Sequence, residues 1–208
     1  MPMSPMSPRK IALLLIGFQK DYFDPDGILY SVVEESHRLS GTLEHTIQVI
    51  DAILDTSITI VNTPIVFSET YHEIDNPMGI LKAIKDAEAF KVGTTGAEIL
   101  PQIQKYGDRI EIIPGKLGFN AFSNTKLKEL LVKRGIERLA IAGCVTSLCV
   151  NATALAAKEN GFEVTILSDC TSSRTPVEQD MFCKEIFPLF TDVVDHNEFA
   201  KSIVRDCD

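Results

Sequence analysis

Short apolar runs alternate with longer amphipathic stretches along most of this chain. Six runs are bounded mainly by Gly, Pro, Asp or Asn, at residues 11–16, 64–67, 109–113, 139–142, 164–167 and 193–194. Nearly continuous apolarity over so few residues is typical of strands buried on both faces. Segment 57–61 is β-branched and is a weaker strand candidate than 64–67. We expect it to be either the end of the preceding helix or a short extra strand.

Helical patterns lie between these runs, at residues 35–53, 80–89, 124–134, 149–160 and 176–189. The pattern at 124–134 has the clearest ends, with Asn124 suited to the N-cap and Gly135 to the position after the last turn. Alternation of this kind predicts an α/β, Rossmann-like fold. We expect a three-layer, doubly wound sandwich whose mostly parallel sheet has about six strands and helices on both faces. No linker divides residues 10–208, which we expect to form one domain after a disordered tail at residues 1–9.

Composition narrows the partners and the compartment. The chain has 208 residues and a net charge of −9, which argues against nucleic acid or an anionic membrane as a partner. Its five cysteines are scattered, odd in number and without a CxxC pair, so we expect neither a disulfide framework nor a zinc knuckle. These features indicate a reducing, cytoplasmic compartment. The N-terminus lacks the apolar core of a secretory signal, and no apolar run has transmembrane length.

Cys149 is the first candidate for chemistry. Ligands of open α/β sheets bind outside the carboxyl ends of the strands. The run 139–142 is followed by Gly143 and a polar turn, and Cys149 then opens a helical pattern. The N–H groups and the dipole of a first helical turn favour a thiolate. Cys149 is therefore a candidate nucleophile, the alternative being a small buried hydrophobic residue.

Lys116 and the histidines allow more than one interpretation. Lys116 follows a Pro-Gly turn after the run 109–113, and either extends into solvent or points inward and stabilises a thiolate. His72 has no second histidine close in sequence, and we expect it and the other three (His37, His45 and His196) to be surface residues. The segment GTTG at 93–96 lacks the Lys-Ser/Thr of a phosphate-binding loop, which predicts a tight turn.

Five segments, taken in order, resemble the isochorismatase-like cysteine hydrolase family, which includes isochorismatases, nicotinamidases and N-carbamoylsarcosine amidases. The first, at residues 11–23, is similar to the family's opening strand and its Asp-x-Gln-x-Asp-Phe turn. Each motif alone is weak, but their common order is specific. The segments are IALLLIGFQKDYF, KVGTTGAEILPQI, KLGFNAF, AGCVTSLCVNATALAA and LSDCTSSRTP.

The resemblance implies an Asp–Lys–Cys triad with Cys149 as nucleophile and Lys116 as its lysine. It also implies a cis peptide between Val145 and Thr146, in a turn that directs backbone N–H groups, including that of Cys149, at the substrate oxygen. The expected substrate is a small amide or a related C–N or ester compound. We expect the pocket to include Gln19, Asp21, Phe23, Phe119 and Phe122.

The chain departs from the family pattern at the triad carboxylate, where it has Gly17. Three outcomes stay open. Cys149 is still activated by Lys116 and the helix N-terminus, giving a slow or altered hydrolase. Another carboxylate (Asp21, Asp24 or Glu69) reaches the site. Or the protein is a catalytically impaired pseudoenzyme that keeps its fold for ligand binding or assembly.

Three further expectations follow from the resemblance, on metals and cofactors, on oligomers and on the reaction. The family's metal-binding Asp-x-His has Thr70 in place of its Asp, so we expect no metal and no cofactor. Family members are commonly oligomers, which predicts a homodimer or a higher homo-oligomer, and the apolar residues around Phe119 and Phe122 would suit such an interface. Vinyl ether hydrolysis relies on the triad Asp and is the family reaction least expected here.

Overall fold

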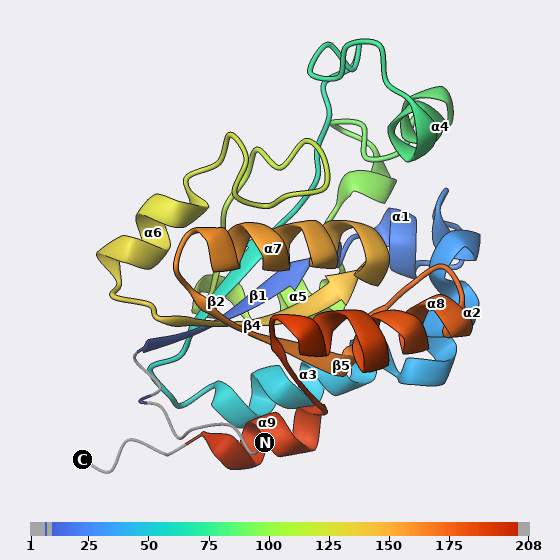
Figure 1. Cartoon of the computed structure of the whole chain (residues 1–208). Coiled ribbons are helices and arrows are strands. Elements are labelled where there is room, and N and C mark those ends of the chain that lie inside the picture. The colour runs from blue at the N-terminus through green and yellow to red at the C-terminus, as the bar shows by residue number, and fades with distance from the viewer. Residues whose placement is uncertain (1–6, 8–9, 204–208) are drawn as a thin grey trace.

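A six-stranded parallel sheet forms the middle layer of the computed structural model, which describes Ser7 and residues 10–203 (Figure 1). Its order is β3-β2-β1-β4-β5-β6, and every neighbouring pair is parallel. The expected fold class is confirmed; the expected tail at residues 1–9 lies, apart from Ser7, outside the described residues. The strands are β1 (Ile11–Ile16), β2 (Thr59–Thr63), β3 (Ile110–Ile112), β4 (Arg138–Cys144), β5 (Glu163–Ser172) and β6 (Asp192–Val194).

Helices cover both faces of the sheet, which explains the continuous apolarity of its central strands. On one face, α3 (Thr42–Ile53) and α9 (His196–Ser202) pack against Leu13 and Leu15 of β1. On the other, α6 (Leu127–Lys133) and α7 (Asn151–Glu159) pack against Leu14 and Ile16. Successive side chains of a strand point to opposite faces, so every position of β1 is buried. None of the described helices has the length and apolar character needed to cross a membrane.

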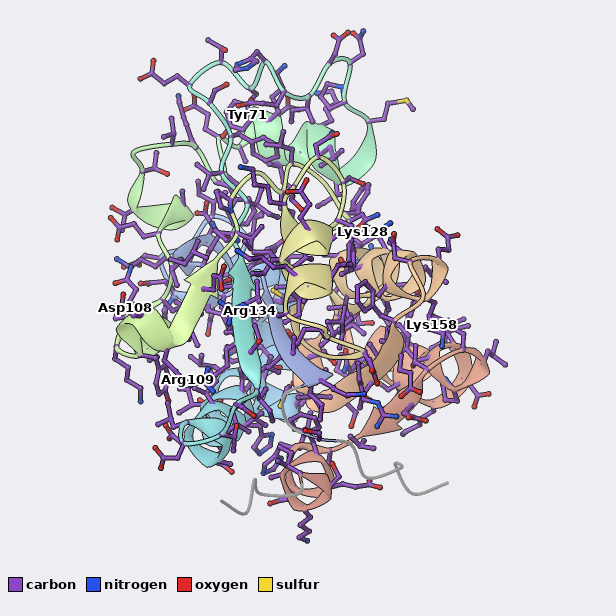
Figure 2. All side chains as sticks on the ribbon, turned by 90° about the vertical axis from the view of Figure 1, so that its left-hand side faces the viewer. Tyr71, Asp108, Arg109, Lys128, Arg134 and Lys158 are labelled. Atoms are coloured by element: carbon purple, nitrogen blue, oxygen red, sulfur yellow. The ribbon has the colours of Figure 1, made fainter. Side chains whose placement is uncertain are left out.

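The remaining elements are short and flank this core. Arg109, labelled in Figure 2, ties the start of β3 to the segment after α3, because its guanidinium donates to four backbone carbonyls between residues 53 and 58. The elements are α1 (Lys20–Phe23), α2 (Tyr30–Ser40), α4 (Gly79–Asp86), α5 (Pro101–Gln104), α8 (Pro176–Met181), the 3-10 turns η2 (Thr95–Ala97), η3 (Gly107–Arg109) and η6 (Phe187–Leu189), and the π turns η4 (Thr146–Val150) and η5 (Phe182–Ile186).

Three expected elements differ from the structure. The second strand is β2 at 59–63 and not 64–67, because Pro64 has no N–H with which to continue the ladder. The expected helix at 35–53 is two helices, α2 and α3, separated by Gly41 with a left-handed φ of 66°. Asn124 does not cap α6; the side chain of Thr125 accepts the N–H of Leu127 instead.

The centre of the sheet places two turns side by side. Strands β1 and β4 are neighbours, and the strand order reverses between them, which is where open α/β sheets bind their ligands. A Cβ atom at Gly143 would lie 1.8 Å from the carbonyl oxygen of Ile16, so only glycine allows β4 to approach the end of β1 this closely. Gly17 therefore lies against the turn that leads to Cys149.

Candidate active site at the carboxyl ends of the central strands

Cys149 and Lys116 meet at this edge of the sheet. Cys149 lies in η4, between β4 and α7, and is 5% exposed. Lys116 follows β3 and is completely buried. Its Nζ atom donates to the Sγ atom of Cys149 at 3.5 Å. Of the two alternatives for Lys116, the inward orientation is the one that the structure shows.

The cation of Lys116 has no carboxylate partner among the described residues. Its ammonium donates to the carbonyl of Gly118 and to the thiol of Cys149, and its backbone forms a bridge with Ile65. A buried charge without an opposite charge is costly. The Cys149 thiol at 3.5 Å is the one side-chain partner of this ammonium among the described residues.

Apolar side chains close the pocket over the thiol. Three of them, Ile80, Leu81 and Ile84, come from α4, which stands beyond the carboxyl ends of the strands (Figure 1). The cavity volume is about 10 Å³, which is room for at most one water molecule. The structure thus shows the pocket closed, with α4 as its cover. The other lining residues are Tyr22, Ile65, Phe67, Gly118, Phe119 and Leu148.

Gly17 occupies a position that has no room for a side chain. Its φ is 74°, and a Cβ atom there would lie 2.8 Å from the carbonyl oxygen and 3.1 Å from the Sγ atom of Cys144. The ring of Tyr22 would be 3.4 Å away. Burial raises the pKa of the Cys144 thiol well above its usual value, and the nearby Cys149 raises it further. Cys144 is therefore a neutral thiol beside the end of β1.

Tyr22 is a pocket residue that sequence reasoning missed. It is 3% exposed and lines the same cavity as Cys149. Burial raises the pKa of its phenol well above the ordinary value, and Cys149, Cys144 and Asp21 raise it further. The phenol thus keeps its proton, and its hydroxyl makes no hydrogen bond within the part of the chain that the structure describes. The family's Asp-x-Gln-x-Asp-Phe turn ends in Asp-Phe, whereas this chain has Asp21-Tyr22. This difference was the available signal that Tyr22 is part of the site.

None of the three alternative carboxylates hydrogen-bonds to Cys149 or Lys116. Asp21 is buried and accepts the backbone N–H of Phe90 at 2.6 Å and that of Ile28 at 3.3 Å. Asp24 accepts the N–H of Asp26, and Glu69 is exposed. The described structure therefore places no carboxylate where the triad would need one.

The turn before Cys149 is supported by α8. Thr146 donates from its hydroxyl to the side-chain oxygen of Gln179 at 2.6 Å, and the Gln179 amide donates to Ser168 and Thr171 of β5. The expectation of a cis peptide between Val145 and Thr146 is wrong by one residue, because the cis bond joins Cys144 and Val145. Val145 and Thr146 are both buried, as the turn lies under α8.

Of the other expected pocket residues, only Phe119 lines the cavity. The side-chain amide of Gln19 hydrogen-bonds to the backbone of Ile65 and Ala97 and holds these segments together. Phe23 stacks on Phe18 with ring centroids 5.2 Å apart. Phe122 packs on Phe162 at 6.0 Å. The first two support the walls of the site from the core.

Comparisons with known proteins identify the family and support the fold. The sequence model described as Isochorismatase domain matches residues 11–198. The chain is similar to a maleamate amidohydrolase of Pseudomonas putida, with 28% identity over 94% of this chain and 87% of that protein. It is also similar to nicotinamidase 3 of Arabidopsis thaliana, with 26% identity over 69% of this chain and 72% of the relative. A solved cysteine hydrolase from Pseudomonas syringae pv. phaseolicola 1448A superposes with a TM-score of 0.81 at 18% identity, covering 96% of this chain and 95% of the other.

Proposed function

The chain belongs to the isochorismatase family, and from this premise we propose that it is a slow cysteine hydrolase of small, uncharged amides or esters. The observation that carries the proposal is the pairing of the buried Lys116 ammonium with the Cys149 thiol at 3.5 Å. The named relatives that hydrolyse amides support the same class of reaction. Loss of a positioned general base typically lowers the rate by about 10²–10⁴-fold, and Gly17 provides no such base.

Catalysis begins with the ionic form of the pair. The Cys149 thiolate attacks the carbonyl carbon, a C–S bond forms, and the π electrons of the carbonyl move to its oxygen. Backbone N–H groups of the turn at 145–149 stabilise this oxyanion. Lys116 keeps the sulfur negative before attack and balances the charge of the pocket during it.

We assign the proton transfers at the leaving group to Tyr22. Its neutral phenol donates a proton to the leaving nitrogen or oxygen as the bond to the carbonyl carbon breaks, which leaves an acyl thioester on Cys149. A water molecule then attacks the thioester, gives its proton to the Tyr22 phenolate, and releases the acid as the C–S bond breaks. Acylation thus leaves Tyr22 as a phenolate and Cys149 as a thioester, and hydrolysis returns both to their starting forms.

The lining of the pocket supports an uncharged, apolar acyl group as the part of the substrate that binds there. Its walls are aliphatic and aromatic, and Lys116 already faces Cys149. A carboxylate on the substrate would meet no second cation among the described lining residues, and burying it unpaired would be costly. Because the closed cavity holds about 10 Å³, α4 has to move for a substrate to enter.

Acylation by p-nitrophenyl esters of short aliphatic acids tests the proposal. We expect a burst of p-nitrophenol, an acyl adduct on Cys149 by mass spectrometry, and slow hydrolysis of the matching amides. Cys149→Ala should abolish all three, whereas Cys183→Ala, which removes a thiol whose pKa burial raises to about 11, should not.

The alternative function is a pseudoenzyme that keeps the pocket for binding, and the crowding at Gly17 favours it. Iodoacetamide at pH 7 separates the two. An active hydrolase should be alkylated at Cys149 faster than at Cys183, and more slowly after Lys116→Met. A protein with neither an acyl adduct nor preferential alkylation of Cys149 is the pseudoenzyme; alkylation without turnover leaves the activated thiol but rejects the hydrolase.

A further inference from the structure

Two histidines and an aspartate meet on the α3 and α9 side of the molecule. His45 belongs to α3, Asp169 to β5, and His196 is the first residue of α9. Each offers a nitrogen or a carboxylate oxygen as a ligand atom, and these three atoms lie within 4.8 Å of one another. The two imidazole rings are stacked, with centroids 4.2 Å apart and 11° between their planes.

The carboxylate of Asp169 is oriented between the two rings. One of its oxygens, Oδ1, accepts the backbone N–H of His196 at 2.9 Å. The other, Oδ2, lies 3.4 Å from Nδ1 of His45 and hydrogen-bonds to Nδ1 of His196. A backbone hydrogen bond to one oxygen thus fixes the direction of the second, which is how ligating carboxylates are commonly held.

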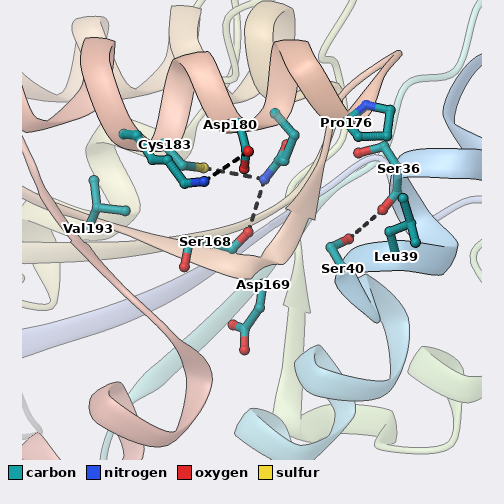
Figure 3. A pocket seen from close by; sticks show the side chains of 11 residues that line it. Ser36, Leu39, Ser40, Ser168, Asp169, Pro176, Asp180, Cys183 and Val193 are labelled. Carbon is teal, nitrogen blue, oxygen red and sulfur yellow. Dashed lines mark hydrogen bonds and ion pairs between the residues drawn. The ribbon is translucent and has the colours of Figure 1, made fainter.

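The cluster is partly open to solvent. Its side chains are 30%, 22% and 12% exposed for His45, Asp169 and His196. Asp169 also borders a pocket of about 360 Å³ that touches Ser168, Asp180 and Cys183. Figure 3 shows its carboxylate pointing away from Asp180 and Cys183, so the ligand atoms lie outside that pocket.

We propose that His45, Asp169 and His196 bind a Zn²⁺ ion, with solvent water completing its coordination. Two imidazole nitrogens and one carboxylate oxygen are a donor set that zinc accepts, and three protein ligands leave a fourth position open. A metal bound at Nδ1 of His196 would replace the present hydrogen bond between this atom and Asp169. Since the ligands come from three elements, the ion would join α9 to α3 and β5.

This site is separate from the Cys149 pocket. The helix α7 that follows Cys149 packs on one face of the sheet, whereas α3 and α9 pack on the other. The ligands are separated by 124 and 27 residues in sequence, so no local motif connects them. The sequence-based expectation that His45 and His196 are isolated surface histidines did not anticipate their meeting.

Calorimetric titration of the metal-free full-length chain with ZnCl₂ tests the proposal. Zinc also binds thiolates, so the titration is made in a Cys149→Ala background as well. We expect one ion per chain in both, proton release on binding, and a rise in the unfolding temperature. His45→Gln and Asp169→Asn should weaken zinc binding at least about 100-fold, more than the 10–100-fold typical of second-shell changes.

His72→Gln is the matched control, because the side chain of His72 is 72% exposed on a loop; it should bind zinc like the wild type. His45→Gln should keep the ester burst of the wild type, which separates this proposal from the proposed function. Equal zinc affinity in His45→Gln and the wild type would overturn the proposal. So would a wild type that neither binds the ion nor gains thermal stability from it, in which case Asp169 only links two imidazoles by hydrogen bonds.

Discussion

Among the described residues, the Cys149 pocket contains a cation without a carboxylate, whereas the His45–Asp169–His196 cluster contains a carboxylate between two imidazoles. In the pocket, Lys116 is fully buried. In the cluster, all three side chains keep some contact with solvent. A charge that solvent cannot reach has to be balanced by the protein itself. The charge of Lys116 can be balanced only by a group inside the pocket, while the half-open cluster can also be reached by a cation from solvent.

Lys116→Met should give the largest effect, because we expect it to lower activity without lowering stability. Loss of the cation removes the partner of the thiolate, and we expect acylation of Cys149 to slow by about 10²–10⁴-fold. The free energy of unfolding should stay the same or increase by up to about 4 kcal/mol, because an apolar isostere replaces a buried charge. Ester-burst kinetics and urea unfolding measure the two quantities. Lys128→Met, at an exposed lysine of α6 labelled in Figure 2, is the control; a parallel loss of both quantities would contradict this account.

Tyr22→Phe should give the next effect, confined to catalysis of amides. Removing the phenol proton leaves the leaving nitrogen without a donor, and we expect amide turnover to fall by about 10²-fold. Esters of p-nitrophenol need no proton on their leaving group, so their acylation should change little. The ratio of the two rates is the measurement, and an equal fall for both would remove Tyr22 from the role assigned to it.

Gly17→Asp tests whether a carboxylate can be put back into the pocket. We expect no gain of activity and a loss of about 1–3 kcal/mol in the free energy of unfolding, because a side chain there meets both a left-handed φ and the Cys144 carbonyl at 2.8 Å. Gly93→Asp separates these causes, since Gly93 has a φ of 78° and nothing within 4 Å of the added Cβ. The control should lose less stability; an active and stable Gly17→Asp protein would show that the turn can open.

Glu178 differs from both regions, because hydrogen bonds from its neighbours keep its carboxylate ionised. We expect its substitution to have the smallest effect, a change in how stability depends on pH. Partial burial alone would raise its pKa, but hydrogen bonds from Arg174, Ser173 and the backbone of Arg174 outweigh burial and lower the pKa to about 2. The folded pKa is depressed, so the unfolded chain binds more protons in this range and the stabilisation grows with pH. It should be complete above about pH 4.5 and be lost as pH falls towards 2. Urea unfolding of Glu178→Gln against the exposed control Glu34→Gln should show a flatter acid limb only for Glu178→Gln.

The local pattern predicted the strands where burial on both faces leaves a continuous apolar run. Residues 11–16 are β1 without change, because this strand lies at the centre of the sheet. The prediction failed at 64–67, where an apolar segment follows a proline and makes only isolated bridges through Ile65 and Phe67. The apolar side chains there form the wall of the pocket. An apolar run in the sequence looks the same whether its residues line a pocket or form a buried β-strand.

Sequence order was sufficient to place Cys149 and Lys116 at the same edge, because both follow strands of one parallel sheet. It could not show that Asp21 is engaged with backbone N–H groups, or that Tyr22 reaches the pocket. The meeting of His45 with His196 was also out of reach. The contact between the two histidines depends on how α3 and α9 pack against β5, and no short segment of sequence encodes that packing.

The cover formed by α4 sets an upper limit on how fast molecules can reach Cys149. Tyr71, labelled in Figure 2, donates from its hydroxyl to the carbonyl of Ala89 and so closes the loop that carries α4 at its two ends. We expect molecules to reach Cys149 only when this cover lifts, a motion typically of microseconds to milliseconds. The rate of Cys149 labelling at high reagent concentration would then level off at the opening rate of the cover, whatever the reagent. The selectivity of the site would depend partly on how long the pocket stays open.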